Sequence, residues 1–96
     1  MYNVLFAKSF LKDMKKIPKE VQKEVLNKWI PKLQENPRLG SNFSGKNLKK
    51  FLRLPFRFKK NDYRMVYTIH NKKITFTLLA IGNRENFYKK LKRKRL

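Results

Sequence analysis

The spacing of hydrophobic residues changes once along the chain and divides it into a helical and a strand-forming part. Residues 2–7 form a short apolar run rich in strand formers, and Ser9 is then placed to cap a helix. Between residues 8 and 36 the apolar positions recur at helical spacing, which predicts two helices joined at Pro18 and a kink at Pro31. The apolar positions are Ala7, Phe10, Leu11, Met14 and Ile17 in the first helix, and Val21, Val25, Leu26, Trp29, Ile30 and Leu33 in the second.

From residue 48 onward the apolar period becomes two, which is typical of strands that bury one face. Three segments of this kind predict an antiparallel meander, at residues 48–58, 62–70 and 73–81. Residues 38–47 before them are a predicted loop, and residues 84–96 a short basic helix or tail. These elements indicate a single α+β domain over residues 1–96, with an antiparallel sheet of about four strands and the helical hairpin on one face.

The turn lengths determine how these strands are expected to pair. A four-residue loop at residues 59–62 places Phe58 opposite Tyr63, and a two-residue turn at residues 71–72 pairs the next two strands. Both pairings place apolar residues on the same side, and a slip of one residue in either would turn them to solvent. The hairpin is therefore expected to cover a face formed by Leu52, Leu54, Phe56, Phe58, Tyr63, Met65, Tyr67, Ile69, Ile74, Phe76, Leu78 and Ala80.

The same register directs arginines to the opposite face of the sheet. Arg57 is expected directly opposite Arg64, with Arg53 on the same face and Arg84 just after the last strand. Like charges that face each other across a strand pair are destabilising, and arginine grips phosphate with a planar fork of donors. The row of arginines therefore predicts a phosphate-binding surface, with a merely solvated basic face as the simpler alternative.

Further residues beside this face are candidates for binding RNA. Phe51 is expected to be exposed on this face by parity, where its ring could stack on a base or could equally sit under the C-terminal segment. The lysines that lead into the first strand of the meander are Lys46, Lys49 and Lys50. Leu79 and Ile81 are also expected on the arginine face, and as apolar residues they need a cover.

Composition narrows the range of partners. The chain has 26 Lys and Arg residues against 6 Asp and Glu residues, a formal net charge of +20, which attracts polyanions. Nucleic acid is the first candidate, an acidic protein segment the second, and an anionic membrane surface a distant third. The absence of cysteine and the single histidine argue against disulfides, thiolate chemistry and metal sites. The chain has neither a membrane-spanning apolar run nor a signal-peptide pattern, so a cytoplasmic protein without a cofactor is expected.

Two motifs carry a resemblance to a known family: DYRMVYTI at residues 62–69 and IGNRENFY at residues 81–88. With these motifs at this separation, and with the order of elements above, the chain resembles the RelE/ParE toxin superfamily of toxin–antitoxin systems, and its RelE branch in particular. The resemblance implies a fold like that of microbial ribonucleases and metal-independent cleavage of mRNA in the ribosomal A site. It also implies inhibition by a cognate acidic antitoxin of the RelB kind.

The resemblance assigns roles to individual residues. Arg64 matches the arginine of the family's YR-x-VY strand, and Arg84 matches the arginine after the glycine of the second motif. Tyr88 matches the tyrosine near the start of the last helix. The family's basic residues on the preceding strand fall near Arg53 and Arg57.

RNA cleavage by its own 2′-hydroxyl needs a base, stabilisation of a crowded phosphorane, and a proton for the leaving oxygen. Preorganised cations supply the second requirement, a role that suits Arg57, Arg64 and Arg84. Asn83 stands where some relatives carry a histidine, so a histidine base is excluded at that position. The candidates for proton transfer are Tyr88 and Lys50, with Glu85 a poorer third.

Two other functions remain open at this point: a ParE-like inhibitor of DNA gyrase, and an RNA-binding basic domain without activity. Tyr88 could equally anchor the last helix to the sheet, and His70 is expected to be exposed, remote from the arginines. The antitoxin is expected to wrap the hairpin and the basic residues 89–95. The last helix could cover Leu79 and Ile81, or an antitoxin could do so by displacing that helix.

Overall fold

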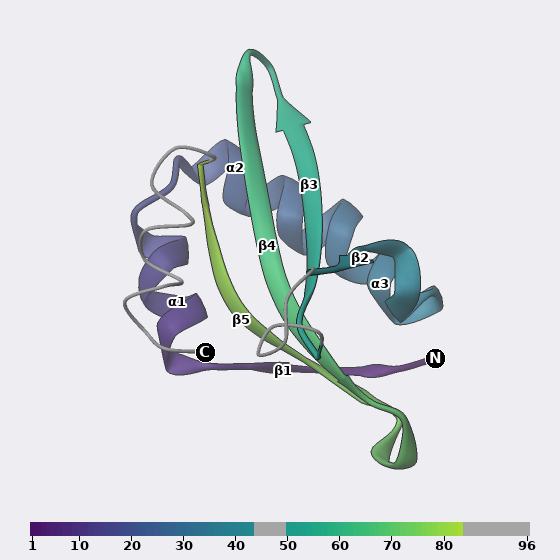
Figure 1. Cartoon of the computed structure of the whole chain (residues 1–96). Helices are drawn as coiled ribbons and strands as arrows, with labels where there is room; N and C mark the ends of the chain where they lie inside the picture. The colour runs from purple at the N-terminus through teal and green to yellow at the C-terminus, as the bar shows by residue number, and fades with distance from the viewer. Residues whose placement is uncertain (44–49, 84–96) are drawn as a thin grey trace.

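A mixed five-stranded sheet carries the α-helices on one face (Figure 1). The computed structural model describes residues 1–43 and 50–83, and the strand order is β1-β5-β4-β3-β2. The strands are β1 (Asn3–Phe6), β2 (Ser41–Asn42), β3 (Leu52–Phe58), β4 (Asn61–His70) and β5 (Thr75–Asn83). The predicted α+β class is confirmed. The sheet differs from the prediction in two ways, because β2 forms within the expected loop and β1 pairs with β5 in parallel.

The N-terminal helices form the predicted hairpin. They are α1 (Lys8–Lys15), α2 (Lys19–Glu24), a π-helical turn (Val25–Trp29) and α3 (Ile30–Glu35). The expected break at Pro31 is confirmed, because the turn before this proline takes the wider π form. Ser9 does not cap α1. The N-cap position is Ala7, and the Ser9 hydroxyl instead donates to the carbonyl of Leu79 at 2.6 Å.

The main hydrophobic core lies between the hairpin and the sheet. α1 turns Phe10 and the carboxylate of Asp13 toward the sheet, and both side chains are buried. Leu11 and Leu26 lie off the buried stripe and are about half exposed, at 49% and 50%, contrary to prediction. The buried members of the core are Phe10, Val21, Val25, Ile30, Leu33, Leu52, Leu54, Phe56, Tyr63, Met65, Tyr67, Phe76, Leu78 and Ile81.

The β3–β4 hairpin is longer than expected, and its register differs from the prediction by two residues. The turn has two residues rather than four, and Lys59 enters the left-handed region with φ 56°. Arg57 therefore faces Asp62, and the predicted direct opposition of Arg57 and Arg64 is wrong. A shift of two residues keeps every side chain on its predicted face, since the strand period is two.

The β4–β5 connection is longer than the predicted two-residue turn. It consists of a 3-10 turn (Asn71–Lys73) followed by Ile74, whose φ of 51° is left-handed, so His70 pairs with Thr75. The register near this turn is again shifted by two residues, which leaves the apolar face of both strands intact. Ile74 itself is 53% exposed and does not join the core.

A β-bulge then changes the faces of β5. The ladder shifts between Val66 and Tyr67 of β4, which leaves Leu79 as the extra residue of β5. Beyond a bulge the two faces of a strand are exchanged. Ile81 therefore enters the main core, and Ala80 leaves it, both contrary to prediction.

A second, smaller cluster lies on the opposite face of the sheet. It consists of Phe43, Phe51, Val66 and Ala80, with Leu79 packed against it. Phe51 is only 4% exposed, so its predicted exposure is wrong. The cover comes from β2, which strand parity does not reveal: β2 pairs with β3 and brings Phe43 over this face.

The hydroxyl of Tyr67 ties the segment after α3 to the sheet. It donates to the Pro37 carbonyl at 2.7 Å and accepts from the Gly40 N–H at 2.9 Å. A Cβ at Gly40 would collide with the carbonyl oxygen of Arg53, so only glycine fits there. Burial raises the pKa of Tyr67, although the Gly40 hydrogen bond and the charge of Arg38 act in the opposite direction.

Candidate nucleic-acid interface

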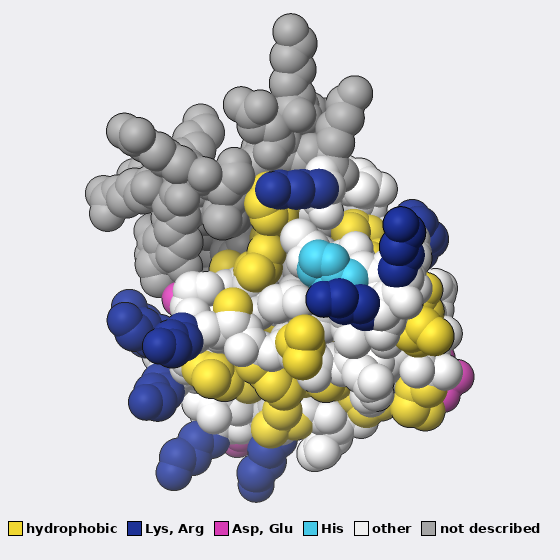
Figure 2. Space-filling view, turned by 90° about the horizontal axis from the view of Figure 1, so that it is seen from below, with side chains coloured by type: hydrophobic (Ala, Val, Ile, Leu, Met, Phe, Trp, Pro, Cys, Tyr) yellow, Lys and Arg dark blue, Asp and Glu magenta, His cyan; other side chains and the backbone are white. Residues whose placement is uncertain are grey.

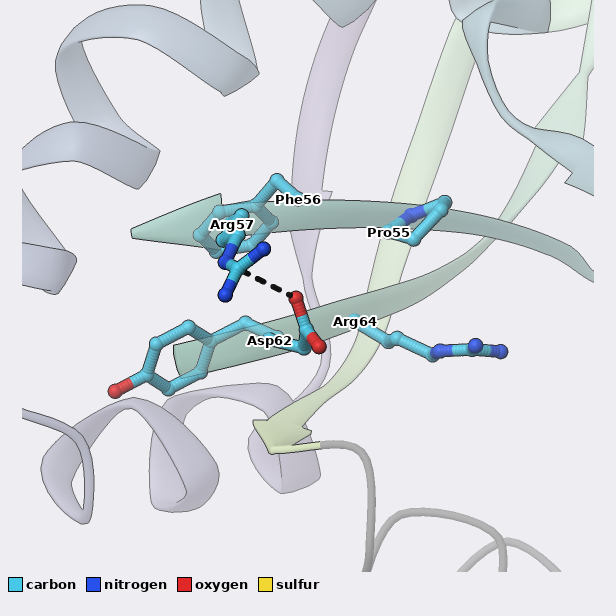
Figure 3. Close-up of a pocket in the computed structure, with 6 residues that line it drawn as sticks. Pro55, Phe56, Arg57, Asp62 and Arg64 are labelled. Carbon is cyan, nitrogen blue, oxygen red and sulfur yellow. Dashed lines mark ion pairs between the residues drawn. The ribbon is translucent and has the colours of Figure 1, made fainter. Parts of the chain in front are cut away.

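An open hollow lies near the β3–β4 turn, and residues of both strands line it (Figure 3). Its volume is about 290 Å³. Two arginines supply positive charge, one aspartate supplies a carboxylate, and a proline supplies apolar surface. The lining residues are Pro55, Phe56, Arg57, Asp62, Tyr63 and Arg64.

Arg57 forms an ion pair across the two strands. Its Nε lies 3.9 Å from Oδ1 of Asp62, and the two side chains are 68% and 52% exposed. At this distance and exposure the pair contributes little to folding, on the order of 0–1 kcal/mol. The guanidinium of Arg57 is therefore available to exchange its carboxylate partner for a phosphate.

Arg64 lies in the interior of β4 and is half-buried. Its neighbours across the strands are Pro55 on β3 and Gly82 on β5. Figure 3 shows the side chain of Arg64 extending away from the Arg57–Asp62 pair. The predicted shared face is confirmed, but the two guanidinium groups do not point toward each other.

The remaining described candidates lie at the β2 end of the same face. Arg53 is half-buried, and its guanidinium lies 5.5 Å from the ring centroid of Phe43. Lys50 is exposed, with its Nζ 5.3 Å from the ring centroid of Phe51. Phe51 itself is covered, so these two cations, rather than its ring, face the solvent.

Several predicted residues lie outside the described residues. These are Lys46, Lys49, Arg84, Glu85, Tyr88 and the basic run at residues 89–95. Their roles remain predictions.

His70 is exposed at the end of β4, as predicted, with Lys and Arg side chains beside it on the face shown in Figure 2. It lies six residues from Arg64 on the same strand, roughly 20 Å away. Within residues 1–43 and 50–83, no three His, Cys, Asp or Glu side chains come together as a metal site would require. None of the helices in that part of the chain is long and apolar enough to span a bilayer.

Four further residues shape this face, and the sequence did not reveal these roles for Gly82, Ser9 and Asp13, whereas Asp62 is one of the two acids that could neutralise the arginines. Asp62 pairs with Arg57, Gly82 faces Arg64, and Ser9 and Asp13 of α1 bind the backbone of β5. One signal was visible, because Asp13 is a carboxylate three residues after Phe10 in a helix, where the buried stripe continues.

Comparison with known proteins identifies the family. A family model described as the ParE-like toxin of type II bacterial toxin–antitoxin systems matches residues 4–92, nearly the whole chain. The chain belongs to this family. The predicted membership of the RelE/ParE toxin superfamily is thereby confirmed. No curated protein sequence matches the toxin.

Solved structures share the fold of the toxin. The RelBE2 toxin–antitoxin complex from Mycobacterium tuberculosis matches at 23% identity and TM-score 0.73, over 86% of this chain and 91% of that one. The intact E. coli RelBE complex matches at 23% identity and TM-score 0.71, over 88% and 99%. The isolated E. coli RelE toxin matches at 21% identity and TM-score 0.69, over the full length of both. At these identities the likeness shows the fold of the toxin.

Proposed function

We propose that the toxin is a metal-independent endoribonuclease that cleaves mRNA on the ribosome. The observation that carries this proposal is the pair Arg57 and Arg64, which line one open hollow on the sheet face opposite the helices. A gyrase inhibitor has no need of two arginines that line one open hollow. A cytoplasmic location goes with this proposal, since mRNA and ribosomes are found there.

The chemistry follows from the charges. The 2′-hydroxyl of one ribose attacks the next phosphate, forms a 2′,3′-cyclic phosphate, and releases the 5′-oxygen of the following nucleotide. Arg57 and Arg64, with Arg84, stabilise the charge that develops on the phosphorane. Tyr88 and Lys50 are the proposed proton-transfer groups, one to accept the hydroxyl proton and the other to protonate the leaving oxygen.

We also propose an acidic antitoxin of the RelB kind as the partner. The net charge of +20 favours a negatively charged segment. Two structural neighbours, from M. tuberculosis and E. coli, are toxin–antitoxin complexes. An antitoxin that contacts the arginine face or the basic residues 89–95 would compete with RNA for the same cations.

The deciding experiment adds purified toxin to a translation reaction and maps the mRNA ends. We expect cuts at stalled codons, with a 2′,3′-cyclic phosphate upstream and a 5′-hydroxyl downstream. An mRNA with a 2′-deoxy sugar at the cleavage site should bind without being cleaved, because the 2′-hydroxyl nucleophile is absent. Cleavage should survive EDTA when polyamine replaces magnesium. Products with a 3′-hydroxyl and a 5′-phosphate would refute the mechanism.

A ParE-like inhibitor of DNA gyrase is the second candidate, favoured by the description of the matching family model. It predicts loss of gyrase supercoiling activity at toxin concentrations that leave translation unaffected. The same preparation of toxin, assayed against gyrase and against translating ribosomes, separates the two functions. A toxin that binds RNA and does neither would be a plain RNA-binding domain.

A further inference from the structure

We propose that Ser9 and Asp13 are positioning residues, which hold the β5 bulge and thereby keep the face beside Arg64 open to RNA. The proposal rests on the proposed function for its effect on cleavage. The two hydrogen bonds from Ser9 and Asp13 to β5, here called the clamp, are a property of the fold and are tested separately.

α1 binds the bulge on both sides. Ser9 Oγ donates to the carbonyl of Leu79 at 2.6 Å, and the N–H of Ile81 donates to Oδ2 of Asp13 at 3.2 Å. Ser9 and Asp13 are four residues apart in α1, so they lie on the same side of the helix. A bulge interrupts the strand ladder and leaves backbone groups without their usual partners. The two side chains bind backbone groups of β5 on either side of Ala80, beyond the point where β1 ends at Phe6.

Packing alone does not favour an aspartate at position 13, which is buried between α1 and the sheet. Its side chain is 6% exposed, and among the described residues it is the charged one that the core buries. A buried carboxylate is costly unless it is hydrogen-bonded, whereas leucine at this position would suit a helix–sheet contact. The Ile81 N–H is one of the partners that satisfy this buried carboxylate.

The bulge decides which side chain stands beside Arg64. Continued without a bulge from the pair of Tyr67 and Leu78, the ladder would place Ile81 opposite Arg64. With the bulge, Gly82 stands opposite Arg64, and Ile81 is 2% exposed in the core. Glycine inside a strand marks a place where a ligand can approach the backbone closely. An RNA phosphate can thus reach Arg64 across Gly82.

The clamp is tested by amide exchange, which does not depend on catalysis. Asp13→Leu keeps the bulk and removes the acceptor, whereas Asp13→Asn keeps an acceptor oxygen. The Ile81 amide should exchange about tenfold faster in Asp13→Leu, the scale for losing one hydrogen bond, and near the wild-type rate in Asp13→Asn. Continued protection of Ile81 in folded Asp13→Leu would overturn the clamp. If Asp13→Leu does not fold, Asp13→Ala, which also removes the acceptor of the Ile81 N–H, takes its place in the same measurement.

The accessibility of the face beside Arg64 is tested by introducing a side chain at Gly82. Gly82→Val places a side chain beside Arg64, and Thr77→Val is the matched control on the same strand, before the bulge and opposite Thr68. At saturating mRNA, Gly82→Val should lower the single-turnover rate at least about 50-fold, close to the loss of one transition-state donor, and Thr77→Val less than about twofold. Both variants should unfold at the wild-type denaturant midpoint. A Gly82→Val rate within about twofold of wild type would overturn the proposal.

A second readout separates this proposal from the proposed function. The NMR signal of the Arg64 Nε–H reports the binding of a short RNA, whether or not the RNA is cut. It should shift on RNA addition in wild type and Thr77→Val, and stay unchanged in Gly82→Val. A wild-type toxin that shows this shift and cleaves no mRNA would refute the nuclease and leave the open face supported. An equal shift in Gly82→Val would refute the open face.

Discussion

The two faces of the sheet are made by alternate residues of the same strands, yet they differ in solvent exposure and in charge. The face under the helices is dry, and Met65, Phe76 and Leu78 have no exposed surface. Among the described residues, the opposite face carries the smaller cluster around Phe43, and Arg57, farther along β3, has a side chain that is 68% exposed. The helix-covered face determines the stability of the fold, whereas the opposite face is available to bind RNA. Substitutions on the first face should therefore lower stability, and substitutions on the second should lower cleavage without unfolding the protein.

The largest expected effect is on the helix-covered face. Phe76→Ala should destabilise the fold by about 3–5 kcal/mol, because a fully buried ring leaves a cavity between the sheet and the hairpin. Urea unfolding followed by circular dichroism measures the loss. Thr77→Ala, one residue along and on the other face, should change stability by less than about 0.5 kcal/mol. Similar losses for both would mean that the two faces do not differ as described.

The next effect is on the arginine face. Arg64→Ala should lower the single-turnover cleavage rate roughly 100-fold, about 2.7 kcal/mol of transition-state stabilisation. The unfolding midpoint and the affinity for RNA should change little, since many other cations remain. Arg84→Ala is expected to behave in the same way. Lys15→Ala on α1 is the control and should be near neutral; wild-type rates in both arginine variants would eliminate the proposed mechanism.

A smaller effect concerns the alkaline stability of the core. Because burial raises the pKa of Tyr67 above 10.0, the folded state keeps the hydroxyl proton at a pH where the unfolded chain releases it. This contribution to stability is complete below pH 10.0 and is lost as pH rises through the folded pKa. Urea titrations from pH 8 to about 11 should show a steeper fall for wild type than for Tyr67→Phe. Lysine titration is common to both proteins, so equal slopes would contradict the raised pKa.

The smallest effect lies at the β4–β5 turn, which belongs to neither face. Ile74 is β-branched and exposed, and its backbone adopts the left-handed conformation. This conformation costs about 1–2 kcal/mol for such a residue. Ile74→Asn should raise the free energy of unfolding by about 1 kcal/mol, because asparagine tolerates this region. Ile74→Val keeps the strain and should show no gain. A stabilised Ile74→Val would point to exposure rather than backbone strain as the cause.

Much of the fold was predictable because strand parity tolerates error. Both turns were assigned lengths that differ by two residues from the observed ones, and the core face survived both shifts since the period is two. The helical hairpin followed from periodicity, and the break before Pro31 followed from the missing N–H.

The rest could not be predicted because it depends on tertiary contacts. The bulge at Leu79 is held by Ser9 and Asp13, some seventy residues away in sequence. Strand parity that ignores this bulge places Ile81 and Ala80 on the wrong faces of the sheet. Phe51 was similarly misassigned, because its cover comes from Phe43 through the two-residue strand β2. Periodicity also carries no information on strand direction, so the parallel pairing of β1 was missed.

The parallel pairing of β1 with β5 has a consequence for synthesis of the toxin. Asn3 pairs with Thr75 and Phe6 with Leu78, so the first strand made waits for the last described strand before it can join the sheet. α1 also depends on β5, because Ser9 and Asp13 hydrogen-bond to Leu79 and Ile81. Contacts this distant in sequence close late in folding. A nascent chain that has not yet released β5 from the ribosome therefore lacks the strand that joins β1 to β4, so the complete sheet and its arginine face form only after β5 has left the ribosome.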